Sequence, residues 1–196
     1  MEAVKLAKLT LDEYLAIERE NETRYEYHNG SIYAMAGGTK NHSILGASVI
    51  RLLGNGLAEK EKNCIVFNSD MKLRILEGNR YVYPDSMVVC TNNDQEDDDQ
   101  GAITNPILIV EVLSETTAGY DRGDKFYFYR QIPSLKEYLL IEQDLPQVEL
   151  FTRQADDAWR IQRVRGLDSM VSLSSLGITI SLADLYRNIS FEEPAS

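Results

Sequence analysis

Hydrophobic and polar positions alternate along the chain with two different periods, and the changes from one period to the other predict the order of helices and strands. Near the amino end, Thr10 and Glu13 have the spacing of a capping box. Apolar residues then recur at helical spacing, which predicts a short helix that ends by Asn21. Two β-prone runs follow on either side of Asn29-Gly30, a pair typical of the tight turn of a hairpin. In the first of these runs, side-chain alternation turns Glu26 to the opposite face from the tyrosines beside it.

A second helix is predicted from Asn41, a residue type that can cap its first turn. One face of this helix would carry the residues expected to pack on a sheet, Ile44, Leu45, Ser48, Leu52 and Leu53. Gly54 and Gly56 would weaken its end.

The middle and the end of the chain are predicted to be mostly strand. β-like runs cover residues 64–75, 81–90 and 106–114, and the last run is almost entirely apolar, as in a strand buried on both faces. A helix over about 121–131 follows, and then strands at about 137–142, 148–152, 159–164 and 171–180. A short helix over 182–186 completes the pattern.

This order of elements predicts the fold class. Strands outnumber helices and helices enclose the central strands, so we expect an α/β or α+β fold with a mixed central sheet flanked by helices. The chain has 196 residues and shows no linker, repeat or break in composition, which indicates one domain over residues 1–196 with its core at about 10–187.

Composition narrows the function classes. The chain has 20 Lys and Arg against 31 Asp and Glu, a net charge of −11, which argues against a simple electrostatic coat for nucleic acid. Part of this acid lies in the run TNNDQEDDDQG, which we interpret as a solvated loop because it lacks the ligand spacing of a calcium loop. No apolar run approaches the roughly 20 residues that span a bilayer and no signal sequence is apparent, so we expect a cytoplasmic protein.

Two cysteines, Cys64 and Cys90, stand 26 residues apart in apolar β-like runs. No CxxC spacing indicates zinc or redox chemistry, so we expect both to be reduced core residues.

The most informative single residue is Glu111, in the middle of ILIVEVL. Burying a carboxylate costs several kcal/mol unless it is paired, protonated or bound to a metal, so a buried ion pair and a metal site are both open. Asp85 follows Pro84 at an expected strand edge, where the alternative is an ordinary turn acid. Two carboxylates from neighbouring strands provide the hard oxygen ligands that magnesium prefers.

Phosphodiester cleavage also needs a cation near the phosphate, and Lys125 is the candidate on the following helix. Asp121, Lys125 and Tyr129 are spaced four residues apart, which places them along one helix face. The alternative is an exposed Asp–Lys pair that contributes a few tenths of a kcal/mol.

These residues occur within longer strings that carry a family resemblance. The segments YEYHNGSIYAMAGGTKNH, YPDSMVV and LIVEVLSETTAGYDRGDKFYFYRQIPSLKEYLLI resemble the Uma-two family of restriction endonuclease-like proteins. The resemblance implies a three-layer PD-(D/E)xK nuclease core with an extra amino-terminal hairpin and extra carboxy-terminal strands. It matches Pro84-Asp85 to the PD motif and Glu111 to the second acid, which makes Asp85 and Glu111 the expected metal ligands.

The chain departs from that motif at one position, because Leu113 stands where the motif has its lysine. The resemblance implies that Lys125 takes over this role from the helix and that Glu26 is an additional acid of the site. We expect four further residues to support the site, namely His42, Asp121, Tyr129 and Asp70, while Ser114 and Thr117 would orient the turn after Glu111.

Other hydrolase and nucleotide-binding signatures are missing, since the chain has no GxSxG, GxGxxG, GK[ST] or HExxH. We therefore predict a magnesium-dependent DNA endonuclease, with manganese as a substitute, acting as a homodimer. The alternative is a catalytically inactive nucleic-acid-binding or assembly module on the same fold, which the acidic net charge favours. DNA would be contacted by one of two arginine-rich groups, unless these are solvated surface: Arg122, Lys125 and Arg130, or Arg160, Arg163 and Arg165.

Overall fold

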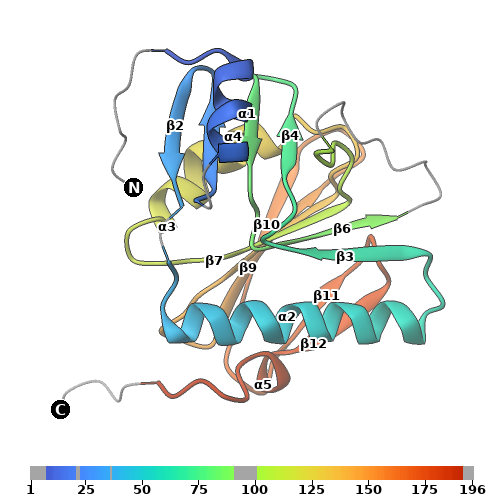
Figure 1. Cartoon of the computed structure of the whole chain (residues 1–196). Coiled ribbons are helices and arrows are strands. Elements are labelled where there is room, and N and C mark those ends of the chain that lie inside the picture. Colours follow the sequence, from blue (N-terminus) through green and yellow to red (C-terminus); the bar gives the residue numbers. More distant parts are fainter. Residues whose placement is uncertain (1–7, 21–22, 36, 91–100, 192–196) are drawn as a thin grey trace.

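The largest element of the fold is a six-stranded sheet, which lies above α2 in Figure 1. The computed structural model describes residues 8–20, 23–35, 37–90 and 101–191. The strand order is β10-β9-β8-β7-β6-β3. The strands are β3 (Cys64–Asn68), β6 (Ser86–Cys90), β7 (Leu108–Val112), β8 (Glu137–Ile141), β9 (Gln147–Arg153) and β10 (Trp159–Arg165). Only β7 and β8 run parallel among these pairs, which confirms the predicted mixed sheet.

A second sheet of four short strands lies above the first, in the order β2-β1-β5-β4. It consists of β1 (Tyr25–His28), β2 (Ser31–Ala34), β4 (Leu73–Ile75) and β5 (Arg80–Val82). The predicted hairpin turn is confirmed, since Asn29 and Gly30 both have positive φ. Helix α1 (Leu11–Glu20) covers this sheet, and its capping box is formed: the Thr10 N–H donates to Glu13 at 2.7 Å, and the Glu13 N–H donates to Thr10 at 3.3 Å.

The chain passes between the two sheets at the PD motif. Strand β5 ends at Val82 in the small sheet and β6 begins at Ser86 in the large one, so Pro84 and Asp85 form the crossing. Asp85 therefore lies where the two sheets meet, close to the end of β7 that carries Glu111.

Helix α2 (Lys40–Glu59) runs along one face of the large sheet. The predicted cap is wrong: Thr39 is the N-cap, and its hydroxyl accepts the His42 N–H at 3.1 Å. The buried face consists of Leu45, Ser48, Val49, Leu53 and Leu57. Three of these were predicted, whereas the predicted Ile44 and Leu52 are only half-buried. The helix also continues through Gly56, where an added Cβ would lie 3.1 Å from Ile178, so this glycine permits close packing.

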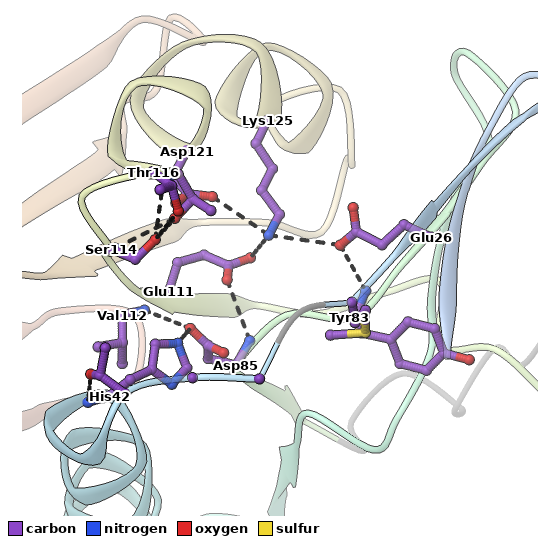
Figure 2. Close-up of a pocket in the computed structure, with 15 residues that line it drawn as sticks. Glu26, His42, Tyr83, Asp85, Glu111, Val112, Ser114, Thr116, Asp121 and Lys125 are labelled. Carbon is purple, nitrogen blue, oxygen red and sulfur yellow. Dashed lines mark hydrogen bonds and ion pairs between the residues drawn. The ribbon is translucent and has the colours of Figure 1, made fainter. Parts of the chain in front are cut away.

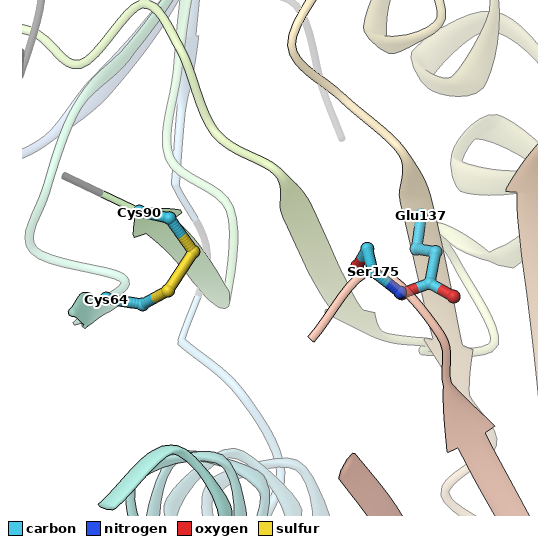
Figure 3. The surroundings of a disulfide bond; sticks show 4 residues. All are labelled: Cys64, Cys90, Glu137 and Ser175. Carbon is cyan, nitrogen blue, oxygen red and sulfur yellow. A yellow bond between two sulfur atoms is a disulfide. The ribbon is translucent and has the colours of Figure 1, made fainter. Parts of the chain in front are cut away.

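In Figure 1, β11 (Met170–Leu173) and β12 (Ile178–Ser181) pass behind α2, and the short helix α5 (Leu182–Leu185) lies below it. Strands β11 and β12 form a separate two-stranded antiparallel sheet. Its turn is fixed to the large sheet by Glu137, whose fully buried carboxylate accepts hydrogen bonds from the backbone and hydroxyl groups of Ser174 and Ser175. Figure 3 shows Ser175 beside Glu137.

The opposite face of the large sheet is covered by the connection between β7 and β8. It is one irregular helix: α3 (Ala118–Tyr120), a π-helical turn η1 (Asp121–Lys125) and α4 (Phe126–Tyr129). The predicted helix over 121–131 therefore exists, but it starts earlier and contains a π turn, a feature frequent at functional sites. Apolar clusters fill both sides of the sheet, which explains why every residue of β7 is buried.

The expectation for the cysteines is wrong. Cys64 and Cys90 are direct partners in the antiparallel β3–β6 pair, and they form a disulfide (Figure 3). Their separation of 26 residues did not indicate this, because the pairing of β3 with β6 brings them together. The predicted acidic loop over residues 91–101 lies outside the described residues, apart from Gly101. Within the described part of the chain, no helix has the length and apolar character needed to cross a bilayer.

Candidate active site

A cavity of about 250 Å³ opens where the two sheets, the π-helical turn and the start of α2 meet. Five of its lining residues were predicted from the sequence as site acids or as the lysine, and they reach it from four different segments: Glu26, Asp85, Glu111, and the pair Asp121 and Lys125 on the π-helical turn. Figure 2 shows these side chains pointing toward one another. The structure thus brings together residues that span 99 positions of sequence, from Glu26 to Lys125.

Glu111 and Lys125 form the centre of this site. The Lys125 Nζ lies 2.8 Å from Glu111 Oε1, and each side chain is at most one-tenth exposed. The Tyr129 hydroxyl donates to the same carboxylate oxygen at 2.8 Å. Burial raises the pKa of Glu111 to about 8, although the Lys125 ammonium opposes this shift. An additional cation nearby would therefore stabilise the charged form of Glu111.

Asp85 is held next to Glu111 from the other side. Its Oδ2 accepts the Val112 N–H at 2.7 Å, and its own N–H points to Glu111 Oε2 at 3.4 Å. His42 Nε2 lies 3.1 Å from Asp85 Oδ2, and the hydrogen bond to Asp85 raises the pKa of His42. A Cβ on Gly38 would lie 2.8 Å from the His42 ring, so the glycine leaves the space that this ring occupies.

Two more carboxylates complete the surroundings of the lysine. Asp121 lies 3.6 Å from Lys125 Nζ, and Glu26 lies 3.9 Å from it across the gap between the sheets. Burial opposes the charge on Lys125, but Glu111 and the other anions outweigh it and raise its pKa well above the usual value. For Glu26, the charges of Lys125 and His28 outweigh burial and lower its pKa. Lys125 is therefore a permanently charged ammonium at neutral pH.

Comparison with known proteins identifies the family. A family model described as "Putative restriction endonuclease", Uma2, matches residues 11–183. The chain belongs to the Uma2 family. The chain is also 36% identical over 184 residues to the uncharacterized protein slr1290 of Synechocystis sp., covering 94% of both chains. It is 39% identical over 170 residues to the uncharacterized protein sll1609 of the same organism, covering 87% of this chain and 95% of the relative.

A solved structure has the same fold. It is described as a "putative nuclease belonging to DUF820 from Anabaena variabilis", and it superimposes with a TM-score of 0.72 at 18% identity. The match covers 91% of this chain and 98% of that chain. The predicted family and fold class are therefore confirmed.

The donor atoms of this Uma2 site fit a hard divalent cation better than they fit a soft one. Asp85 lies beside Glu111, and three carboxylates, those of Glu26, Glu111 and Asp121, lie within 4 Å of the lysine. Over the described ranges, no three His, Cys, Asp or Glu side chains form a group that could hold a metal ion by themselves. A cation held by Asp85 and Glu111 would complete its shell with water, backbone or substrate oxygens, as magnesium commonly does.

Asp70, one of the predicted supporting residues, lies outside the cavity. It is paired with Arg24 at 2.6 Å and its side chain is 72% exposed. Tyr129, by contrast, contacts Glu111 directly, and Ser114 and Thr117 hydrogen-bond each other at 2.8 Å in the turn after β7.

Three of the six cations that were expected to contact DNA, namely Arg122, Lys125 and Arg163, are paired with carboxylates. Arg122 pairs with Glu142 and Glu149, and Arg163 lies 3.0 Å from the same Glu149. Glu149 on β9 is thus shared between Arg122 on the π-helical turn and Arg163 on β10. The sequence pattern missed these ion pairs because it does not show which acid lies opposite each arginine.

Tyr83 also lines the cavity, and the sequence pattern did not single it out. Its N–H lies 3.4 Å from Glu26 Oε1, which ties the hairpin strand to the PD crossing (Figure 2). Its position directly before Pro84 was the one available signal.

Proposed function

We propose that the protein is a magnesium-dependent endonuclease that hydrolyses phosphodiester bonds of DNA. The observation that carries this proposal is the buried contact of Lys125 with Glu111 beside Asp85, at one open cavity. A lysine and two carboxylates from adjacent strands are the groups that phosphodiester cleavage needs. The family match supports the same reaction class.

Asp85 and Glu111 are the proposed magnesium ligands, and manganese is the expected substitute. The charge of the cavity supports this assignment, because one lysine and one histidine do not balance four buried or half-buried carboxyl groups. Bound magnesium would supply a water of lowered pKa and would neutralise charge on the phosphate.

Each protein group then has a distinct task. Lys125 keeps its proton and stabilises the extra negative charge on the phosphate in the transition state. Glu26 and Asp121 hold the ammonium from two sides. Tyr129 fixes one oxygen of Glu111, and His42 with the Val112 N–H fixes Asp85.

A larger groove supports a polymeric substrate. It has a volume of about 750 Å³ and shares His42, Asp85 and the Gly37-Gly38 backbone with the catalytic cavity. Its lining also includes Arg24, Ser43 and Asn68. Apart from Asp85, a DNA strand in this groove would meet mainly neutral polar groups and an arginine paired with Asp70, although the net charge of the chain is negative.

One observation favours a second candidate function. Because Lys125 pairs directly with Glu111, the site is already satisfied as a buried ion pair. A catalytically inactive nucleic-acid-binding or assembly module would keep this pair for stability alone. Cleavage and binding assays separate the two candidates.

The experiment is cleavage of supercoiled plasmid and of single-stranded DNA by the purified protein, with Mg²⁺, Mn²⁺ or EDTA. We expect metal-dependent nicking that is lost in Lys125→Ala and retained in Asp70→Asn, an acid outside the cavity. DNA binding without cleavage under every metal condition would support the inactive module. The absence of both binding and cleavage would contradict the nuclease proposal.

We also propose that the protein acts as a homodimer, so that two sites cut two strands. Edge strand β10 supports this, because Ile161 on it is 58% exposed. Light scattering over a range of concentrations tests it, and a monomer at all concentrations would contradict it.

The cytoplasmic location stays a prediction. The Cys64–Cys90 disulfide argues against it, because disulfides are rare in cytosolic proteins.

A further inference from the structure

A second cavity lies beside the catalytic one. It has a volume of about 310 Å³, which is at the lower end of the range for small-ligand pockets. Its lining consists of His28, Tyr33, Thr116, Thr117, Tyr120 and Asp124. Three of these six residues carry a flat ring, and the nuclease mechanism uses none of the six.

The three rings come from two different parts of the chain. His28 and Tyr33 belong to the hairpin strands β1 and β2, and Tyr120 belongs to α3 on the helix that carries Lys125. The His28 ring lies 4.7 Å from that of Tyr33 and 6.3 Å from that of Tyr120, and it is inclined by only 21° to the latter. Both tyrosines are half-buried, so the rings line an accessible cavity.

This aromatic cavity is joined to the catalytic cavity. Thr116 and Thr117 line both of them. His28 Nε2 also lies 3.1 Å from Glu26, the acid that reaches Lys125 from the hairpin. A group bound among the rings would therefore lie next to a phosphate bound at Lys125.

We propose that this cavity is a stacking subsite for one unpaired nucleobase of the nucleotide next to the scissile phosphate. The inference rests on the proposed nuclease function and specifies its substrate class: a single strand, or a duplex from which one base is turned out. Aromatic rings bind bases of any sequence by stacking, and enzymes hold turned-out bases in pockets of this kind.

Charge supports a base in preference to a phosphate. Asp124 lines the cavity and Glu26 lies directly behind His28, so a phosphate would be repelled. A base ring is neutral, and its exocyclic amino group can donate to a carboxylate such as Asp124.

The test uses single-stranded deoxyoligonucleotides that carry 2-aminopurine at one position, with Ca²⁺ in place of Mg²⁺ to limit cleavage. Stacking on a ring quenches 2-aminopurine, so quenching should appear at one or two positions of the oligonucleotide only. Tyr120→Leu should weaken binding about 5- to 100-fold, which corresponds to the loss of one base–aromatic stack. Tyr120→Phe keeps the ring and should bind within about twofold of wild type.

Two further variants complete the design. Tyr33→Leu tests the hairpin side of the cavity independently, in case Tyr120→Leu does not fold. Tyr127→Leu is the matched control, because Tyr127 is an aromatic residue on α4 that is 51% exposed and lies outside both cavities.

The outcomes separate the subsite from the nuclease. If wild type cuts DNA but shows no position-specific quenching, and both leucine variants bind as wild type does, the subsite is wrong and the nuclease proposal stands. If wild type neither binds nor cuts any DNA, the nuclease proposal is wrong and the subsite falls with it. A duplex with a central mismatch, compared with a fully paired one, then shows whether the base is turned out of a duplex.

Discussion

Lys125 on the π-helical turn lies 2.8 Å from Glu111 on the buried strand β7, and both side chains are shielded from solvent. Lys125 also lies within 4 Å of Asp121 and Glu26, so a single ammonium connects the helix, the large sheet and the hairpin sheet. This contact should affect both the free energy of unfolding and the proposed cleavage activity, and the two can be measured separately.

The first prediction concerns the buried ion pair itself. Lys125→Met should lower the free energy of unfolding by about 3 kcal/mol at pH 8, because removal of one partner leaves buried carboxylates without a counter-charge. Adding Glu111→Gln to this variant should restore part of the loss. Urea unfolding of the two single variants and the double variant measures the coupling, and additive effects would contradict a direct interaction.

The second prediction concerns pH. Glu111 has a folded-state pKa of about 8 against an ordinary value of 4.5, so the folded protein binds more protons than the unfolded chain between these values. Its contribution to stability is complete below about pH 4.5 and is lost as pH rises through about 8. In EDTA, the wild type should therefore lose more stability than Glu111→Gln between pH 5 and pH 8. Parallel melting-temperature curves would show that the pKa of Glu111 is not raised.

The third prediction concerns Gly38. Gly38→Ala should push the His42 ring away from Asp85, because the new Cβ would lie 2.8 Å from that ring. The pKa of His42, followed by NMR titration, should fall toward the ordinary value of 6.5. Gly37→Ala is the matched control, since nothing lies within 4 Å of its added Cβ. An unchanged His42 titration in Gly38→Ala would contradict the contact.

The fourth prediction concerns the disulfide. Reduction, or the double change of Cys64 and Cys90 to alanine, should lower the free energy of unfolding by about 3 kcal/mol, because the bond closes a loop of 26 residues in the unfolded chain. Urea unfolding with and without dithiothreitol measures this. Equal stability in both conditions would show that the cysteines contribute only as packed side chains.

Much of the fold was predictable because short sequence patterns indicate individual helices, strands and turns. The Asn29-Gly30 turn, the capping box at Thr10 and the apolar run around Glu111 each indicate their own element without reference to the rest of the chain. The N-cap was misplaced because Asn41 and Thr39 are both good capping residues, and only the path of the backbone decides between them.

The candidate site was predictable as a set of residues but not as a geometry. The PD crossing and Glu111 stood out as acids in apolar surroundings, whereas Asp70, which has the same chemistry, lies on the surface with Arg24. The π turn that places Asp121 and Lys125 together and the pairing of Cys64 with Cys90 depend on contacts distant in sequence. Such contacts leave no signal in a single chain.

The central claim is that Glu111 takes part in metal-dependent phosphodiester cleavage, and one comparison of rates tests it most directly. Plasmid nicking by wild type, Glu111→Gln and Asp70→Asn should be measured at saturating Mg²⁺, with circular dichroism to verify that each variant is folded. We predict that Glu111→Gln lowers the rate at least about 100-fold while Asp70→Asn stays within about twofold of wild type. Equal nicking rates for Glu111→Gln and Asp70→Asn would contradict the assigned site.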